Sequence, residues 1–345
     1  MGFLDSFRKK NQEEQSDYIE EVEEEAVDPY DAAVTTRKVE STPKEEIPVS
    51  VPEPTPEPQP ASEPEAEPEP EPQKPAPAQE SLPHEFGKSK GGPSKVLTII
   101  NQKGGVGKST TAINLAAALG EKKKKVLIVD LDPQGNSTSG LGIEKKEIKQ
   151  CVYDVLLNDL SINDVVVKNA YKNVDVVPAT INLAGAEVEL VTEIARENRL
   201  KEAIAKVKNN YDYIFIDCPP SLGLLTVNAL VAADKLLIPI QTEFYALEGV
   251  TKLLDSMKRV KTRLNTKLDI FGVLLTMYDG RTTLAKQVSD EVRKYFKKLV
   301  FDTKIPRTVK ISEAPSFGQP ITQYEPTCKG AIAYKELAKE VISRG

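Results

Sequence analysis

The stretch that decides the fold is "KVLTIINQKGGVGKSTTAINLAAALG", residues 95–120. A short β-branched run is followed by a glycine-rich loop and then by apolar residues at helical spacing. Strand, glycine loop and helix in this order are the context in which a phosphate-binding loop forms. The usual pattern G-x-x-x-x-G-K-[ST] would place a glycine at position 102, which is Gln102 here. Lys103 adds a second lysine to a loop that needs only Lys108.

The loop has the chemistry of a nucleotide-phosphate site. Its glycines let backbone N–H groups surround an anion without Cβ clashes, and the positive end of the next helix points to the same place. Lys108 is expected to hold the β- and γ-phosphates, and Ser109 to offer its hydroxyl to Mg²⁺. A tight strand–helix turn without a ligand is the alternative. The predicted nucleotide-binding residues in the loop are Lys103, Gly104, Gly105, Val106, Gly107, Lys108, Ser109 and Thr110.

Two further strand ends carry carboxylates. "VLIVDLDPQGN" delivers Asp130 and Asp132, and "YIFIDCPPS" delivers Asp217. A carboxylate that follows an apolar strand is placed to meet Mg²⁺ directly or through water. Each of these residues alone could be a helix cap or a turn residue. Together with the loop they predict a metal site formed by Ser109, Asp130, Asp132 and Asp217.

Strands and helices alternate through the rest of the body, and several strands are apolar on both faces. This pattern predicts an α/β fold with a doubly wound, mainly parallel sheet and helices on both faces. In such sheets ligands bind beyond the carboxyl ends of the strands. The expected strands are 95–100, 125–130, 173–179, 211–220, 235–241 and 270–278, and a long helical pattern covers 183–210 with one break.

The first 94 residues differ from the remainder in composition. The chain of 345 residues has a net charge of −6, but residues 1–94 hold 23 acidic and 9 basic residues, whereas 95–345 hold 29 and 37. Of the 25 prolines, 16 precede residue 95. We therefore expect a disordered, solvated Pro/Glu-rich arm over 1–94 and a folded domain over 95–345, with the boundary near "KSKGGPS", 88–94.

Composition also excludes several classes of site. Cys151, Cys218 and Cys328 are far apart, which argues against a disulfide scaffold, a zinc site or an iron–sulfur cluster and favours a reducing cytosol. The single histidine, His84, lies in the arm, so the body has no Ser-His-Asp triad. No apolar run reaches the ~18 residues of a membrane span. The start "MGFLDS" fits the short myristoylation pattern, which often matches by chance.

The stretch "KGGVGKST" resembles the deviant Walker A motif of the ParA/MinD family, whose extra lysine defines the group. "VLIVDLDPQGNSTSGLG", "YDYIFIDCPPSLGLLTVNALVAAD", "PIQTEFYALEGV", "GVLLTMYDGRTTLAKQV" and "IPRTVKISEAPSFGQPITQYEPTCKGAIAYKELAKEV" resemble the Soj/ParA chromosomal partition ATPases. The likeness runs through 95–345. It implies a P-loop NTPase fold and Mg²⁺-dependent ATP hydrolysis by a homodimer that sandwiches ATP. It further implies non-specific DNA binding, release stimulated by a ParB-type centromere-binding protein, and a cytoplasmic, nucleoid-associated location in bacteria.

The resemblance gives Lys103 a role. The family's signature lysine reaches across the ATP-bound dimer to the partner's phosphates, much as an arginine finger does. By the same likeness Asp132 positions the attacking water, and Asp130 and Asp217 lie near the metal. Pro306 belongs to the segment that borders the adenine. The catalytic residues so implied are Lys103, Lys108 and Asp132.

Basic residues near the end of the body are candidates for DNA contact. In the Soj group such residues map onto Arg281 and Lys310, and Arg307 is a third, weaker candidate. The chain reads "RTTL" where "RTNL" is usual, and has lysine at 310 where arginine is common, which keeps the charge but loses the bidentate fork. Binding should be directed at the phosphate backbone. "KKKK" at 122–125 is interpreted as a solvated helix end.

Other readings stay open at this point. A MinD-like membrane-associated or cargo-positioning ATPase is the main alternative, and "MGFLDSFRKK", residues 1–10, could contact a membrane or a partner through Phe3, Leu4 and Phe7. A reductase partner like the nitrogenase iron protein is excluded by the placement of the cysteines. The arm either restrains DNA binding electrostatically or acts as a plain spacer.

Overall fold

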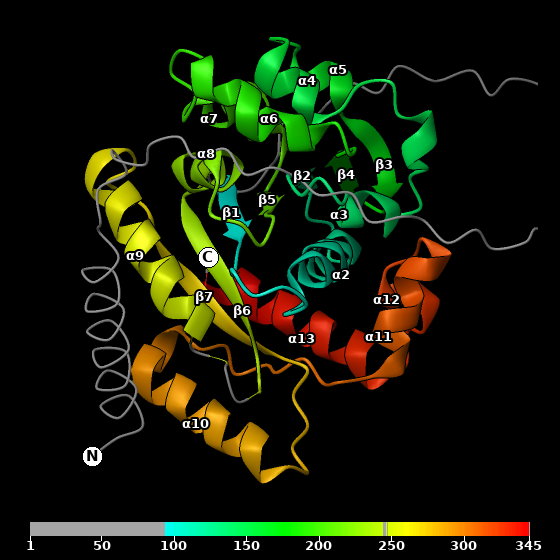
Figure 1. Ribbon diagram of the computed structural model, residues 1–345. Coiled ribbons are helices and arrows are strands. Elements are labelled where there is room, and N and C mark those ends of the chain that lie inside the picture. The colour runs from blue at the N-terminus through cyan, green and yellow to red at the C-terminus, as the bar shows by residue number, and fades with distance from the viewer. Residues whose placement is uncertain (1–93, 244–245, 247, 345) are drawn as a thin grey trace, which may run out of the picture. The chain divides into compact units, whose positions relative to one another are not determined.

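The computed structural model describes residues 94–344 except 244, 245 and 247 (Figure 1). The predicted arm, its boundary with the domain and the possible membrane segment at 1–10 lie outside these residues and stay predictions. The strands are β1 Lys95–Ile99, β2 Val126–Asp130, β3 Val167–Tyr171, β4 Val174–Val177, β5 Tyr213–Asp217, β6 Lys235–Gln241 and β7 Asp269–Thr276. The helices are α2 Lys108–Glu121, α3 Asn136–Ser139, α4 Val152–Leu157, α5 Ile162–Val165, α6 Leu183–Glu189, α7 Arg199–Ala205, α8 Leu224–Ala232, α9 Glu248–Arg263, α10 Thr283–Phe296, α11 Val309–Glu313, α12 Ile321–Tyr324 and α13 Lys329–Arg344.

The seven strands form one sheet in the order β3-β4-β2-β5-β1-β6-β7. Every neighbouring pair is parallel except β3 and β4, which are antiparallel. The predicted mainly parallel sheet is therefore confirmed. The edge strand β3 was not predicted, because its sequence VKNAY is polar and half-exposed and lacks the apolar run of the inner strands.

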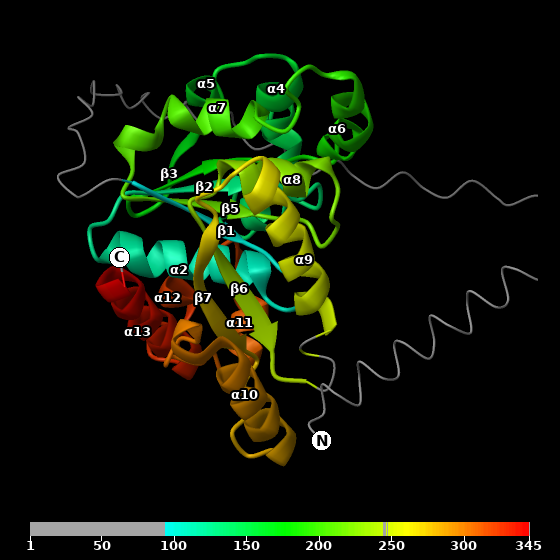
Figure 2. The same cartoon turned by 90° about the vertical axis from the view of Figure 1, so that its left-hand side faces the viewer.

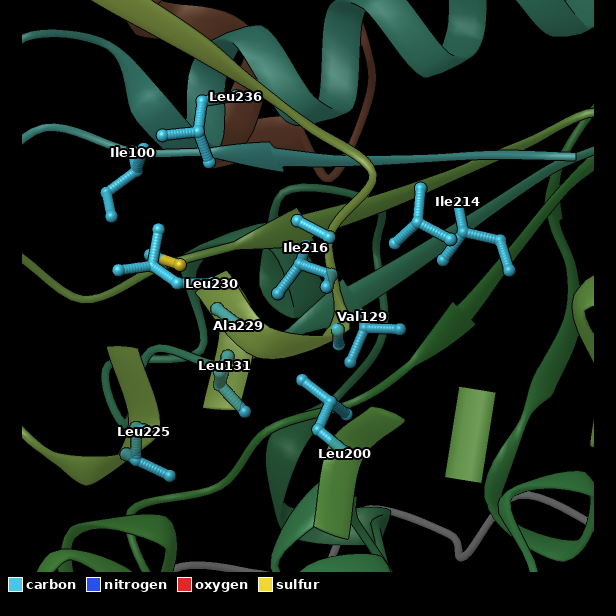
Figure 3. Packing of buried hydrophobic residues seen from close by; sticks show 14 of the residues in the cluster. Ile100, Val129, Leu131, Leu200, Ile214, Ile216, Leu225, Ala229, Leu230 and Leu236 are labelled. Atoms are coloured by element: carbon cyan, nitrogen blue, oxygen red, sulfur yellow. The ribbon is translucent and has the colours of Figure 1, made fainter. Parts of the chain in front are cut away.

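Helices cover both faces of the sheet, as a doubly wound fold requires (Figure 2). On one face the sheet packs against α7, α8 and their neighbours, and Figure 3 shows Ala229 and Leu230 of α8 close to Ile216 of the sheet. On the other face the core contains residues of α2 and α13, and α2 packs directly on α13. None of the helices in the described part of the chain is long and apolar enough to cross a bilayer.

The register of the central strands determines where the site lies. β5 is inserted between β1 and β2, so that Asp217 pairs with Ile99 on one side and with Asp130 on the other. The carboxyl ends of three strands thus finish at the same level. The glycine loop that follows β1 and the acidic ends of β2 and β5 are brought together by this register.

The long helical pattern over 183–210 is interrupted in the structure. α6 continues into a 3₁₀ turn, Leu190–Thr192, and α7 begins only at Arg199. Ala195 lies between them with φ 54°, a left-handed conformation that a continuous α-helix does not allow. The predicted break is confirmed, and it leaves a short exposed connection between the two helices.

Candidate functional site

The glycine loop adopts a conformation that only glycines take up without strain. Gly105 has φ 73° and Gly107 has φ 89°, both left-handed. α2 begins immediately after Gly107, and no side chain in the described part of the chain caps it. The first N–H groups of α2 are therefore available to an anion. This conformation fits the phosphate cradle that the sequence predicts.

The loop is fixed to the neighbouring strands by side chains. Asn101 donates from Nδ2 to the Pro239 carbonyl at 2.8 Å, and its Oδ1 accepts the N–H of Lys103 at 3.0 Å. From the far side, the Thr276 hydroxyl at the end of β7 donates to the Val106 carbonyl at 2.8 Å. These bonds fix the loop to the ends of β6 and β7.

The two lysines of the loop have different surroundings. Lys108 is buried, and its Nζ donates to the carbonyl of Lys103 at 3.4 Å. A buried ammonium is costly unless a negative group accompanies it, so Lys108 fits a site for phosphates. The side chain of Lys103 instead lies near Glu243, with an Nζ–Oε2 distance of 3.8 Å, and is 35% exposed. Glu243 also accepts from Gln241 Nε2 at 2.5 Å.

Asp217 is fully buried at the end of β5. Its Oδ2 accepts the hydroxyl of Ser137 at 2.6 Å, whereas Oδ1 has no hydrogen-bond partner among the described residues. Burial raises the pKa of Asp217, and the hydroxyls of Ser137 and Ser109 and the charge of Lys108 oppose this rise. Ser109 lies near enough to affect the pKa, but only Ser137 meets hydrogen-bond geometry. An unpartnered buried carboxylate oxygen is a position where a metal or a metal-bound water fits.

Asp130 is buried beside Asp217 but has a different role. Its Oδ2 accepts both the N–H of Thr138 at 2.8 Å and the Thr138 hydroxyl at 2.7 Å, and its Oδ1 accepts the N–H of Asp132 at 3.3 Å. Burial and the charge of Asp217 raise the pKa of Asp130. Both oxygens are used within the chain, so Asp130 anchors the turn that carries Asp132. Asp132 is also buried, and its Oδ1 accepts the N–H of Gln134 at 2.9 Å.

The residues present fit a magnesium ion that is held mainly by phosphates and water. Among the described residues no three His, Cys, Asp or Glu side chains gather into a metal cage. Mg²⁺ in nucleotide sites usually has one or two protein ligands and keeps several waters. The Ser109 hydroxyl and the open oxygen of Asp217 meet that requirement. The predicted metal site of Ser109, Asp130, Asp132 and Asp217 stays a prediction.

Three of the other predicted residues, Pro306, Arg281 and Arg307, lie near the segment that follows β7. Tyr278 pairs with Pro306 in a short parallel bridge, and the Arg307 N–H donates to the Tyr278 carbonyl at 3.3 Å. Arg281 makes a fork with Asp279, donating from Nε at 2.9 Å and from Nη2 at 2.7 Å. Hydrogen bonds from Arg281, with the charge of Arg307, lower the pKa of Asp279 to about 2.

Lys310 stands apart from this arginine pair. Its Nζ donates to Glu313 at 2.9 Å, and this bond raises the pKa of Lys310. Arg281, Arg307 and Lys310 are all exposed, so the structure brings two of the three predicted DNA contacts to one acidic residue and leaves the third a few residues away at the start of α11.

Several residues that shape the site were not predicted from the sequence. Asn101 lies inside the quoted loop but carries no motif signal of its own. Ser137 and Thr138 belong to "GNSTSG", where only a run of small polar residues after an acidic strand end hinted at a role. Thr276 ends a distant strand, and its place beside the loop follows from strand order alone.

Comparison with known proteins agrees with this geometry. A family model described as AAA domain matches residues 94–270. The sporulation initiation inhibitor protein Soj of Bacillus subtilis is 58% identical over 251 residues, which cover 73% of this chain and 99% of Soj. The chromosome partitioning protein ParA of Myxococcus xanthus is 52% identical over 250 residues, 72% of this chain and 88% of that protein.

Solved structures show the same fold, and one of them contains a bound nucleotide. A Mycobacterium smegmatis structure, named as cobyrinic acid a,c-diamide synthase with a bound ATP analogue and magnesium, is 39% identical, covers 72% of this chain and 94% of its own, and has a TM-score of 0.64. The cell division ATPase MinD of Pyrococcus furiosus is 28% identical with a TM-score of 0.62, over 73% of this chain and all of that one. The shaped phosphate loop, the paired lysines and the identity to Soj and ParA along nearly their whole length lead to one conclusion: this chain belongs to the Soj/ParA family of chromosome-partitioning ATPases.

Proposed function

We propose that the protein binds ATP with Mg²⁺, dimerises around the nucleotide, binds DNA without sequence preference in that state, and leaves DNA when a ParB-type centromere-binding protein stimulates hydrolysis. The cycle would segregate a chromosome or plasmid and place the protein on the nucleoid. The main observation that supports this proposal is the position of Lys103. Its carbonyl accepts a hydrogen bond from Lys108, while its own side chain is partly exposed and lies near Glu243. A lysine so placed is available to a second subunit.

The residues of the site have different roles in hydrolysis. The N–H groups at the start of α2 and Lys108 hold and orient the phosphates. Ser109, and Asp217 through water, would hold Mg²⁺, which would supply positive charge to the phosphates when bound. Asp132 is fixed by its turn at the site and would accept a proton from, or orient, the attacking water. Lys103 of the second subunit would add charge only when the dimer forms, which makes dimerisation a condition for fast turnover.

DNA binding is proposed for the surface with Arg281, Arg307 and Lys310. Arg281 is 90% exposed, and its ion pair with Asp279 is of the solvent-exposed kind that phosphate can replace. Lys310 is paired with Glu313 in the same manner. The folded part of the chain is basic overall, which suits a polyanion.

The membrane-associated alternative has less support in the described residues. α13 is not a free amphipathic helix, because its apolar residues Tyr334, Leu337 and Val341 are buried against the body. Membrane contact through residues 1–10 lies outside the described residues. Sedimentation with DNA and with anionic liposomes separates the two functions, since co-sedimentation with liposomes alone would favour the alternative.

The test of the proposed function is Lys103→Ala, with Lys267→Ala as control. Lys267 is an exposed lysine just before β7, at the opposite end of that strand from the loop. We expect Lys103→Ala to bind ATP nearly normally but to dimerise weakly, and to lose partner-stimulated hydrolysis by about 10²-fold or more. The control should match the wild-type protein. Wild-type stimulated turnover in Lys103→Ala would exclude a role across the dimer.

A companion variant tests the water-positioning role. Asp132→Ala should bind ATP and form a dimer that persists on DNA, because chemistry slows by about 10²-fold while nucleotide affinity is kept. Dimer lifetime on DNA and single-turnover hydrolysis are the measurements. If the variant cannot bind ATP, Asp132 holds the metal or the fold rather than the water.

A further inference from the structure

One segment exposes apolar side chains in a row. Ile181 is 68%, Val188 74%, Val191 53% and Ile194 88% exposed, and all four lie in or beside α6 and the 3₁₀ turn that follows it. We call these four residues the apolar row. Leu222, in the loop before α8, is 40% exposed. Contiguous exposed apolar residues mark interaction sites more often than single ones do.

The opposite side of the same segment is already used by the fold. Leu183, Ala186 and Leu190 are fully buried in the core. Val188 and Val191 are three residues apart, so they share the outer side as the helix tightens into the 3₁₀ turn. Ile194 follows the turn after the extended residue Glu193 and is also exposed. A helical segment that is apolar on both sides is typical of one that is covered on both sides.

The surface around the apolar row is acidic. Between 180 and 199 the chain has four glutamates, Glu187, Glu189, Glu193 and Glu197, against two arginines, which gives a net charge of −2. Arg196 is paired with Glu197 at 3.2 Å and Arg199 with Glu193, so the uncompensated carboxylates are those of Glu187 and Glu189. The folded part of the chain is basic as a whole, so this surface has the opposite sign to the candidate DNA contacts. It is unsuited to a phosphate backbone and suited to a segment that combines basic and apolar side chains.

Glu187 connects this surface with the nucleotide site. Its carboxylate accepts the N–H of Leu224 at 2.7 Å and that of Leu225 at 3.4 Å, and so caps α8, whose own N-cap residue Gly223 provides no side chain. A Cβ at Gly223 would lie 2.1 Å from Glu187 Oε2, so the carboxylate sits directly over the glycine. α6 and α8 lie next to each other in Figures 1 and 2.

The loop that ends at this cap begins at Asp217. Residues 217–223 run from the buried carboxylate with the open oxygen to the glycine under Glu187. The loop is thus held at one end by the site and at the other by a side chain of the exposed segment. Displacement of α6 would release the second end while leaving β5 in place.

We propose that the apolar row, with Leu222, is the docking surface for a basic segment with apolar anchors that belongs to the partner that stimulates hydrolysis, and that Glu187 transmits docking to loop 217–223. The proposal rests on the proposed function and names the place and chemistry of its regulation. A second copy of this chain is a less suitable occupant, because a two-fold interface would set the acidic surface against itself.

The experiment uses the full-length ParB-type protein of the same organism as the probe. The variant Val188→Ser with Ile194→Ser replaces two residues of the apolar row. The matched control is Leu264→Ser with Ile332→Ser, because Leu264 and Ile332 are exposed apolar residues outside the row, with exposed fractions of 41% and 51%. Equal thermal unfolding midpoints establish that all variants fold. We expect the row variant to lose about tenfold or more in partner affinity, to keep ATP-dependent dimerisation and basal hydrolysis, and the control to match the wild-type protein.

Glu187→Gln tests transmission separately from docking. It keeps an oxygen that can accept one N–H but loses the charge at the cap. We expect partner affinity within about threefold of wild type and basal turnover unchanged, with the stimulated turnover reduced about fivefold or more. Glu187→Asp, which restores the carboxylate, should recover part of the stimulation.

Other results would refute docking at the apolar row, transmission through Glu187, or stimulation by the partner. Wild-type affinity and stimulation in the row variant place docking elsewhere, and loss of ATP-dependent dimerisation makes the row a contact between copies. If Glu187→Gln is stimulated normally, Glu187 only caps α8. If the wild-type protein itself hydrolyses ATP and binds DNA but is not stimulated by the probe, the regulatory part of the proposed function fails first, and the docking surface fails with it.

Discussion

The hydrogen bond from the Thr276 hydroxyl to the Val106 carbonyl should contribute to nucleotide affinity. It is a buried bond of 2.8 Å between the end of β7 and the middle of the phosphate loop. Thr276→Val keeps the branched shape but leaves the carbonyl without its donor, which costs about 1–3 kcal/mol at a buried site. If that cost falls on the loop conformation that ATP selects, the Kd for ATP rises about 5-fold to 150-fold.

Two measurements separate the local effect from a global one. Calorimetric titration with ATP and Mg²⁺ gives the Kd, and urea unfolding without nucleotide gives the free energy of unfolding. Thr276→Ser is the control, because it keeps the hydroxyl and should bind ATP within about threefold of wild type. An unchanged Kd in Thr276→Val would refute the view that this bond shapes the loop, whatever happens to global stability.

Three further perturbations have defined outcomes. Burial raises the pKa of Asp217 from 3.8 to about 6, so the folded state binds a proton more tightly than the unfolded state does. Without Mg²⁺ the free energy of unfolding should therefore fall as the pH rises from about 4 through 6, and Asp217→Asn should make this fall smaller. The same pH dependence of urea unfolding in Asp217→Asn and wild type would contradict the prediction. Arg281→Ala with Lys310→Ala should weaken binding to unrelated DNA sequences alike and lower the salt slope by roughly 0.9 per lost phosphate contact, whereas Lys267→Ala should not; equal slopes would place the DNA surface elsewhere. A shortened chain that starts at Ser94 should bind DNA more tightly than the full chain at low salt, with the difference closing near ~0.15 M, because the arm's 23 acidic residues compete with phosphates; no difference would leave the arm a spacer.

The fold class could be predicted because its signals are local. The apolar runs of β1, β2 and β5 are complete in themselves, and the observed strands lie within the predicted ones. β3 could not be found in this way, since an exposed antiparallel edge strand needs no apolar run. Its existence follows from pairing with β4, which only the folded chain shows.

The residues of the loop were predictable for the same reason, but their partners were not. The sequence places Asp130 and Asp217 at strand ends, yet it contains no sign that β5 lies between β1 and β2 and sets these two carboxylates opposite each other. Nor does it indicate that Asp130 is saturated by Thr138 while one oxygen of Asp217 stays open. Such differences depend on contacts between residues that are far apart in sequence. The register and the order of the strands determine which of these contacts form.

The packing of α13 on α2 has a consequence for biosynthesis. α2 follows the phosphate loop and is buried along nearly its whole length, partly by α13, which the ribosome makes about 200 residues later. Until α13 has left the exit tunnel, the nascent chain holds a finished glycine loop on a helix with one apolar side uncovered. Exposed apolar surface of this kind makes incomplete chains prone to aggregation, so we expect full nucleotide binding only after α13 has been synthesised and has packed on α2.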